Sequence, residues 1–237
     1  MEDFIQQFAN WKFYLFGSYP VGDLGGLALN IILAALTVVL SFFIAIILGY
    51  GRLSRIKMIR LPVGWFIDVV RSTPLLMIVF WFYFFLPYIF GEHITVFRST
   101  LFSLSIYASA YQAEIVRAGI LAVPKGQMDA SLSLRLSKYQ AMRFIILPQA
   151  FRIMIPSFVS FFVSLFKDTS IAYIIGVVEL TRSGVIVSQL EPDKIYAAYL
   201  IVAIGFWVIS YSISHVATML EKRMGTLDYD SIRLHRR

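Results

Sequence analysis

The chain has 237 residues, of which 59% are hydrophobic and only 15% are charged, and its mean hydropathy is +0.75. Soluble domains carry about 25% charged residues, so the composition excludes an ordinary water-soluble fold and predicts an all-α membrane protein. We expect one transmembrane domain over residues 1–237. The absence of cysteine excludes disulfides and thiolate chemistry, and three scattered histidines, His93, His215 and His235, argue against a histidine metal site.

Five stretches are long and apolar enough to cross a bilayer, which takes about 20 residues. They lie near residues 26–50, 61–90, 96–119, 149–166 and 195–220. The second stretch is too long for one straight span and contains Arg71 and Pro74. We therefore expect a bent or tilted helix that breaks at the proline. Residues 168–180 are apolar but short, which favours a re-entrant or interfacial segment.

The distribution of basic residues predicts the orientation. The N-terminal sequence MEDFIQQFANWKF has no basic region followed by an apolar core and a cleavage site, so we expect no removable signal peptide. Fourteen of the 21 Lys and Arg residues fall after the first span (Arg52, Arg55, Lys57, Arg60), around the loop between the third and fourth spans (Arg117, Lys125, Arg135, Lys138, Arg143) and in the C-terminal tail (Lys222, Arg223, Arg233, Arg236, Arg237). Cytoplasmic loops are enriched in Lys and Arg. The N-terminus is therefore predicted outside and the C-terminus inside, and the net charge of +7 needs no nucleic acid.

The loop near residues 120–148 combines basic and small residues with a regular apolar pattern. Apolar side chains recur every three or four positions, at Met128, Leu132, Leu136, Tyr139, Met142 and Ile146. This spacing predicts an amphipathic helix on the cytoplasmic side. Such a helix either lies on the lipid surface or fits a groove on a partner protein, and the periodicity leaves both uses open.

Four stretches of this sequence resemble one family. Asp129-Ala130-Ser131 followed by Ile145, Leu147 and Pro148 resembles the EAA loop of membrane subunits of bacterial binding-protein-dependent ABC importers. The stretches RSTPLLMIVFWFYFFLP (71–87), YQAEIVRAGILAVPKGQ (111–127) and LPQAFRIMIPSFVSFFVSLFKDTSIAYIIGVVELTRSG (147–184) resemble the polar amino-acid branch. The resemblance therefore covers nearly the whole chain from the first span onward.

The resemblance implies that the loop is a coupling helix seated in a cleft of a cytoplasmic ATPase. The residues that it assigns to this contact are Gly126, Asp129, Ala130, Ser131, Arg135, Leu147 and Pro148. Asp129 and Ser131 replace the family's Glu and second Ala, and Arg135 replaces a Gly that turns the chain between two short helices. Three consequences are open: a more continuous helix, a contact from Arg135 to an acidic group on the ATPase, or pairing with a second, different permease chain.

The resemblance also implies the assembly and its cargo. The chain would be a non-catalytic, multi-pass permease subunit in a bacterial cytoplasmic membrane, working with a second permease subunit, two ATPases and an extracytoplasmic solute-binding protein. It contains no G-x-x-x-x-G-K-[ST] phosphate loop, so we expect no cofactor on this chain and ATP with Mg²⁺ on the partner ATPases. Glutamate and aspartate are the first expected substrates. Glutamine, or the basic amino acids arginine, histidine and lysine, come next, and a passive channel or a membrane scaffold are the rival readings.

Charged residues within spans are candidate functional sites, because each costs about 2.5–3.5 kcal/mol at the membrane centre. Asp68 and Arg71, and Glu114 and Arg117, are spaced three apart, which favours ion pairs within or between helices. Arg71 alternatively faces the pathway and meets a substrate carboxylate. The candidate pathway residues are Arg71, Ser72, Thr73, Glu114, Lys167, Asp168, Thr169 and Ser170. For Thr169 and Ser170 the alternatives are capping of a helix that starts there and a gate or a contact to the binding protein.

Overall fold

The computed structural model describes residues 11–91 and 94–223, and every regular element in this part of the chain is helical. The longer helices are α2 (Gly26–Arg52), α3 (Lys57–Ser72), α4 (Leu75–Phe90), α5 (Val96–Ala122), α8 (Leu147–Asp168), α9 (Leu180–Leu190) and α10 (Ile195–Arg223). Shorter elements are α6 (Lys125–Ser133), α7 (Lys138–Ala141), a π-helical turn (Met142–Ile146) and 3₁₀ turns at Thr169–Ile175 and Pro192–Lys194. The expectations for the first ten residues, for His93 and for the tail beyond residue 223 lie outside the described residues.

Three helical segments among the described residues are long and apolar enough to cross a membrane: Gly26–Arg52, Lys138–Ile175 and Pro192–Met219. They correspond to the first, fourth and fifth expected spans. A fourth crossing is formed if α3 and α4 together make one broken span. Helix α5, the third expected span, is as long as α2 but less apolar. The structure thus supports a multi-pass helical bundle, and the number of five crossings stays a prediction.

The expected break in the second stretch is present at Pro74. Thr73 is extended, with φ −92° and ψ 133°, as expected for a residue that precedes proline, and its hydroxyl donates to the Val69 carbonyl at 2.8 Å. The two helices on either side meet at 107°. One bent or tilted helix over residues 61–90 is therefore the wrong description, because the chain turns through more than a right angle and forms two helices.

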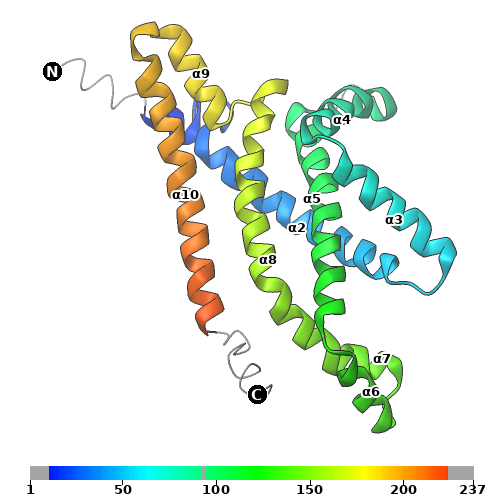
Figure 1. Cartoon of the computed structure of the whole chain (residues 1–237). Helices are drawn as coiled ribbons and strands as arrows, with labels where there is room; N and C mark the ends of the chain where they lie inside the picture. Colours follow the sequence, from blue (N-terminus) through cyan, green and yellow to red (C-terminus); the bar gives the residue numbers. More distant parts are fainter. Residues whose placement is uncertain (1–10, 92–93, 224–237) are drawn as a thin grey trace.

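Helix α5 lies at the centre of the bundle and packs against α2, α3, α4 and α8 (Figure 1). Buried residues of α2 recur every four positions, at Leu33, Thr37, Ser41, Ala45 and Gly49. Small residues allow membrane helices to approach closely, and a Cβ atom on Gly49 would lie 2.8 Å from Val116 Cγ1 of α5. The amide of Gln112 in α5 donates to Ser41 Oγ at 2.8 Å. Small side chains and one buried hydrogen bond thus hold α2 against α5.

The segment between α5 and α8 forms two short helices at one end of the bundle (Figure 1). Helix α6 ends at Ser133, Arg135 adopts a left-handed conformation with φ 61°, and α7 begins at Lys138. A capping box starts α7: Ser137 Oγ accepts from the Gln140 backbone N–H at 3.2 Å, and Gln140 Oε1 accepts from the Ser137 N–H at 2.8 Å. The continuous helix considered from the sequence is therefore wrong.

The break also divides the apolar stripe that predicted one amphipathic helix. Ile146 is buried, whereas Leu132 and Tyr139 are 37% and 67% exposed. Leu134, which lies off the predicted stripe, is 77% exposed. The apolar side chains of this segment therefore do not share one buried face, and Leu132, Leu134 and Tyr139 are exposed.

Residues 169–180 link α8 to α9 at the end of the bundle opposite α6 and α7 (Figure 1). Helix α8 continues directly into a 3₁₀ turn at Thr169, and Thr169 Oγ1 donates back to the Phe166 carbonyl at 2.6 Å. The expectation that Thr169 and Ser170 cap a new helix is therefore wrong. Gly176 then takes the left-handed conformation that turns the chain toward α9, with φ 97°.

Candidate functional site

A cluster of charged side chains joins α2, α3 and α5. Arg52 Nη1 and Nη2 donate to the two carboxylate oxygens of Asp68 at 2.8 and 3.2 Å. Arg52 Nε lies 3.7 Å from Glu114 Oε2, and Arg117 Nε donates to Glu114 Oε1 at 2.9 Å. The expected ion pairing of Asp68, Glu114 and Arg117 is confirmed. The partner of Asp68 is Arg52 of the preceding helix, however, and not Arg71.

Arg71 is held by an aromatic ring rather than by a carboxylate. Its guanidinium carbon lies 5.2 Å from the centre of the Tyr111 ring, and the Tyr111 hydroxyl donates to the Arg71 carbonyl at 3.3 Å. The structure gives Arg71 no ion pair with any of the described residues. Because Arg52 and Arg117 already match Asp68 and Glu114, the charge of Arg71 is the excess charge of the cluster.

Arg71 and Glu114 line one cavity of about 340 Å³ between the end of α3 and the facing sides of α5 and α8. Its other polar groups come from Tyr111 and Ser157, and its apolar wall includes Phe161 and Ile153. The Tyr111 and Phe161 rings stack, with their centres 5.9 Å apart and their planes 16° from parallel. The cavity thus offers a guanidinium, a carboxylate and two hydroxyls, and a guanidinium is suited to two-point binding of a carboxylate.

The remaining predicted pathway residues do not line this cavity. Ser72 is exposed, and the hydroxyl of Thr73 is used at the end of α3. Lys167, Asp168, Thr169 and Ser170 lie at the opposite end of α8 from the coupling segment. Lys167 is exposed and Asp168 is half-buried. Of the eight predicted residues, the cavity therefore brings together only Arg71 and Glu114.

A buried polar network near Thr169 was not foreseen from the sequence. Asn30 Nδ2 of α2 donates to Thr169 Oγ1 and to Glu179 Oε2, both at 2.9 Å, and Asn30 Oδ1 accepts from the Leu180 N–H at 2.9 Å. The Glu179 carboxylate caps α9 by accepting from the backbone N–H groups of Thr181 and Arg182 at 2.9 and 2.8 Å. The sequence signal that could have indicated it is an asparagine inside an apolar span.

The close approach of two chain segments completes this network. The Gly26 N–H donates to the Val178 carbonyl at 3.0 Å, and a Cβ atom on Gly25 would lie 2.5 Å from the Val178 carbonyl oxygen. Only glycine allows the start of α2 to approach the segment before α9 this closely. The network therefore anchors residues 169–180 to α2.

The residues assigned to ATPase contact lie in two groups. Gly126, Asp129, Ala130 and Arg135 are exposed on α6 and on the turn that follows it. Ser131 is buried, and its hydroxyl donates to the Gln127 carbonyl at 2.6 Å. Leu147 and Pro148 stand at the start of α8. The structure thus places the first group at the projecting tip and the second at its base.

The part of the chain that the structure describes contains no candidate metal centre. No group of three or more His, Asp or Glu side chains there is arranged to hold an ion.

Comparison with known proteins identifies the family. The profile of the binding-protein-dependent transport system inner membrane component family matches residues 41–226. Over 200 residues the chain is 34% identical to the probable glutamine ABC transporter permease protein GlnP of Bacillus subtilis (strain 168), covering 84% of this chain and 91% of that one. It is also 34% identical over 200 residues to the L-cystine transport system permease protein TcyB of the same organism, covering 84% and 85%.

A solved structure agrees with these relatives. The crystal structure described as an amino acid ABC transporter with histidines superposes with a TM-score of 0.80 and 29% identity, over 93% of this chain and 97% of that one. The profile covers most of the chain, and the relatives are permeases for amino acids. The chain therefore belongs to the binding-protein-dependent transport system inner membrane component family, as a multi-pass permease subunit of a polar amino-acid ABC importer in the bacterial cytoplasmic membrane.

Proposed function

We propose that this subunit carries acidic amino acids, glutamate and aspartate, into the cytoplasm and performs no catalysis itself. In this proposal the chain crosses the membrane five times, with its N-terminus outside and its C-terminus inside. Two partner ATPases bind ATP and Mg²⁺, a second permease subunit of different sequence completes the pathway, and an extracytoplasmic binding protein delivers the substrate. Family membership supports this kind of assembly.

The shape of the coupling segment supports its proposed contact with an ATPase. Helices α6 and α7 project from the end of the bundle (Figure 1), and Leu132, Leu134, Tyr139 and Asp129 are exposed on this segment. Exposed apolar side chains that cluster on a projecting segment are typical of protein interfaces. A rigid segment of this kind transmits the closure of the ATPases to α5 and α8, to which it is directly joined.

The uncompensated charge of Arg71 is the observation that carries the substrate proposal. It faces a cavity whose one carboxylate, Glu114, is already paired with Arg117. An amino acid that enters brings its own α-carboxylate, and an acidic one brings a second carboxylate and a net negative charge. Arg71 is exposed at this cavity, so a substrate carboxylate can reach its guanidinium. Its positive charge therefore favours acidic substrates and disfavours lysine and arginine.

Glutamine is the second candidate, because several of the similar permeases are named for it. The α-carboxylate of glutamine can bind Arg71 as that of glutamate does. Its neutral side chain gains nothing from the excess charge. The two candidates therefore differ in how strongly uptake depends on the charge of Arg71.

Uptake by the reconstituted transporter tests the proposal. The complete assembly in proteoliposomes is supplied with binding protein and ATP, and uptake of labelled glutamate and glutamine is compared for the wild type and for Arg71→Gln. Loss of a hydrogen-bonded charged partner costs about 1.5–3 kcal/mol, so we expect Arg71→Gln to lower glutamate uptake about tenfold or more. Glutamine uptake should fall less, and Arg71→Lys should retain part of the glutamate uptake.

The controls separate the alternatives. Arg98→Gln removes an exposed arginine at the start of α5 and should leave uptake unchanged. Equal rates for the wild type and Arg71→Gln would contradict the role of Arg71, and a glutamine rate that exceeds the glutamate rate in the wild type would favour glutamine. Uptake without ATP indicates a passive channel, and no uptake under any condition indicates a scaffold.

A further inference from the structure

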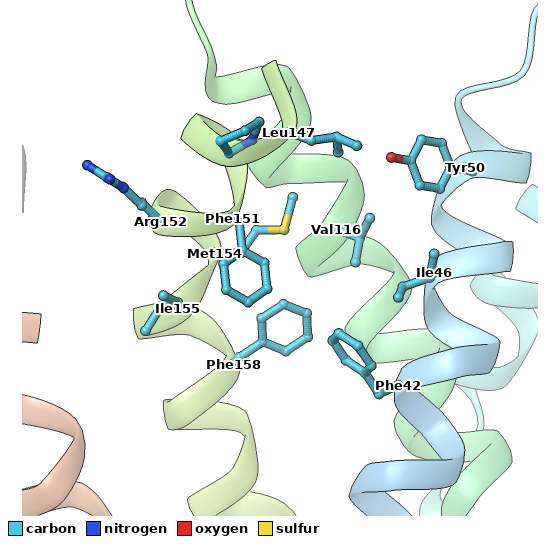
Figure 2. Close-up of a pocket in the computed structure, with 11 residues that line it drawn as sticks. Phe42, Ile46, Tyr50, Val116, Leu147, Phe151, Arg152, Met154, Ile155 and Phe158 are labelled. Carbon is cyan, nitrogen blue, oxygen red and sulfur yellow. The ribbon is translucent and has the colours of Figure 1, made fainter. Parts of the chain in front are cut away.

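A second, larger cavity of about 910 Å³ opens between α2, α5 and α8 (Figure 2). Its wall is almost wholly apolar and includes Phe42, Ile46, Val116, Phe151, Met154 and Phe158. It shares only Met154 with the cavity beside Arg71. Its chemistry is also different, because its two polar side chains, Tyr50 and Arg152, stand at the rim and no carboxylate lines it.

The surroundings of this cavity indicate what fills it. Apolar cavities stay dry, and in a membrane the apolar groups available to enter are lipid acyl chains. On α2, Phe43 and Ile47 stand next to the lining residues Phe42 and Ile46 and are 64% and 73% exposed. Helix α2 therefore presents apolar side chains suited to lipid on the turns that also line the cavity.

Two polar side chains stand at the rim of the cavity. Figure 2 shows the hydroxyl of Tyr50 pointing from α2 toward the cavity and the guanidinium of Arg152 pointing away from it, toward the Leu147 end of α8. That end joins the basic coupling segment. Arginine side chains near membrane ends extend toward the headgroups, where each basic residue attracts anionic lipid.

We propose that this cavity is a binding site for an anionic phospholipid of the cytoplasmic leaflet. One acyl chain fills the space between α2, α5 and α8, the phosphate contacts Arg152, and Tyr50 offers a hydroxyl donor on the opposite rim. The leaflet rests on the orientation proposed above. The charge of Arg152 commits the site to an anionic headgroup over a neutral one.

Fluorescence quenching tests this site independently of transport. In the assembled transporter this subunit carries Phe in place of its four tryptophans and one new tryptophan in the cavity, Ile46→Trp or, as a second reporter, Phe42→Trp. The signal of the same assembly without the new tryptophan is subtracted. It is placed in vesicles that contain brominated phosphatidylglycerol or brominated phosphatidylcholine. One basic residue favours anionic lipid about fivefold, so half-maximal quenching should need about fivefold less brominated phosphatidylglycerol than brominated phosphatidylcholine.

Two matched variants control the experiment. Arg152→Gln should bring the two lipids to the same half-maximal fraction, whereas Arg143→Gln, which removes an exposed arginine that does not line the cavity, should keep the preference. Tryptophan at the exposed position 47 should respond to both lipids alike. Equal quenching by the two lipids at position 46 would overturn the proposal. So would quenching at 47 with none at 46, because a protein segment would then fill the cavity.

Discussion

Single polar side chains tie distant parts of this chain together. Asn30 is fully buried in α2, yet its amide contacts Thr169, Glu179 and the backbone of Leu180. Its contacts lie 139 to 150 positions away in the sequence. A buried carboxylate without hydrogen-bond partners is costly, and Asn30 is one of the groups that prevent this cost at Glu179. The position of residues 169–180 therefore depends strongly on one amide.

Replacing Asn30 by leucine tests this dependence. Asn30→Leu keeps the size of the side chain but removes two donated bonds and one accepted bond, one of them to a carboxylate. Bonds to charged groups are worth about 1.5–3 kcal/mol each, so we expect the free energy of unfolding to fall by about 3 kcal/mol in a detergent titration. Ile31→Ala, at the neighbouring exposed position, should cost less than about 1 kcal/mol. Similar losses for both variants would show that the network contributes little.

At the scale of elements, the coupling segment shows how a fold keeps its geometry when the preferred residue is missing. Arg135 holds the left-handed turn between α6 and α7, a conformation that glycine adopts without strain. The backbone of the turn is closed by the Leu136 N–H, which donates to the Ser131 carbonyl at 3.2 Å, and by the capping box of Ser137 and Gln140. These flanking hydrogen bonds hold the turn despite the side chain of Arg135.

Two substitutions at position 135 should therefore have opposite effects. A left-handed conformation costs a residue other than glycine about 1–2 kcal/mol. Substitution by glycine removes this cost, but the greater freedom of glycine in the unfolded chain offsets part of the stability gained. Arg135→Gly should raise the free energy of unfolding of the purified chain by about 0.5–1 kcal/mol, and its thermal midpoint should rise accordingly. Arg135→Val should lower it, because β-branched residues tolerate this conformation worst. A lower midpoint for both variants would contradict the strained turn.

Across the whole molecule, local signals predicted more than long-range ones. Local signals extend over short stretches of sequence. Pro74 predicted a break between helices, the five apolar stretches predicted helices, and the polar coupling segment predicted a helical connection, and the structure contains each of these. The angle of 107° after Thr73 depends on tertiary packing. The partner of Asp68 likewise depends on which helix packs beside α3. The three-residue spacing between Asp68 and Arg71 therefore did not identify Arg52 as that partner. The continuous helix, one of the alternatives considered at Arg135, was wrong because the flanking hydrogen bonds and the capping box determine the turn.

The proposed mechanism requires α6 and α7 to project into the cytoplasm, where an ATPase can reach them. The chain has no cysteine, so single cysteines at exposed positions report the side of the membrane directly. Lys125→Cys and Lys138→Cys place the label on α6 and α7, and Ser18→Cys places it in the N-terminal segment before α2. All three positions are exposed.

Labelling with a membrane-impermeant maleimide is the most direct measurement. We expect Cys substitutions at 125 and 138 to react in inside-out vesicles and to stay unlabelled in intact spheroplasts, and the substitution at 18 to show the reverse. Labelling of positions 125 and 138 from the outside of intact spheroplasts would contradict the account, because no cytoplasmic ATPase could then bind the segment.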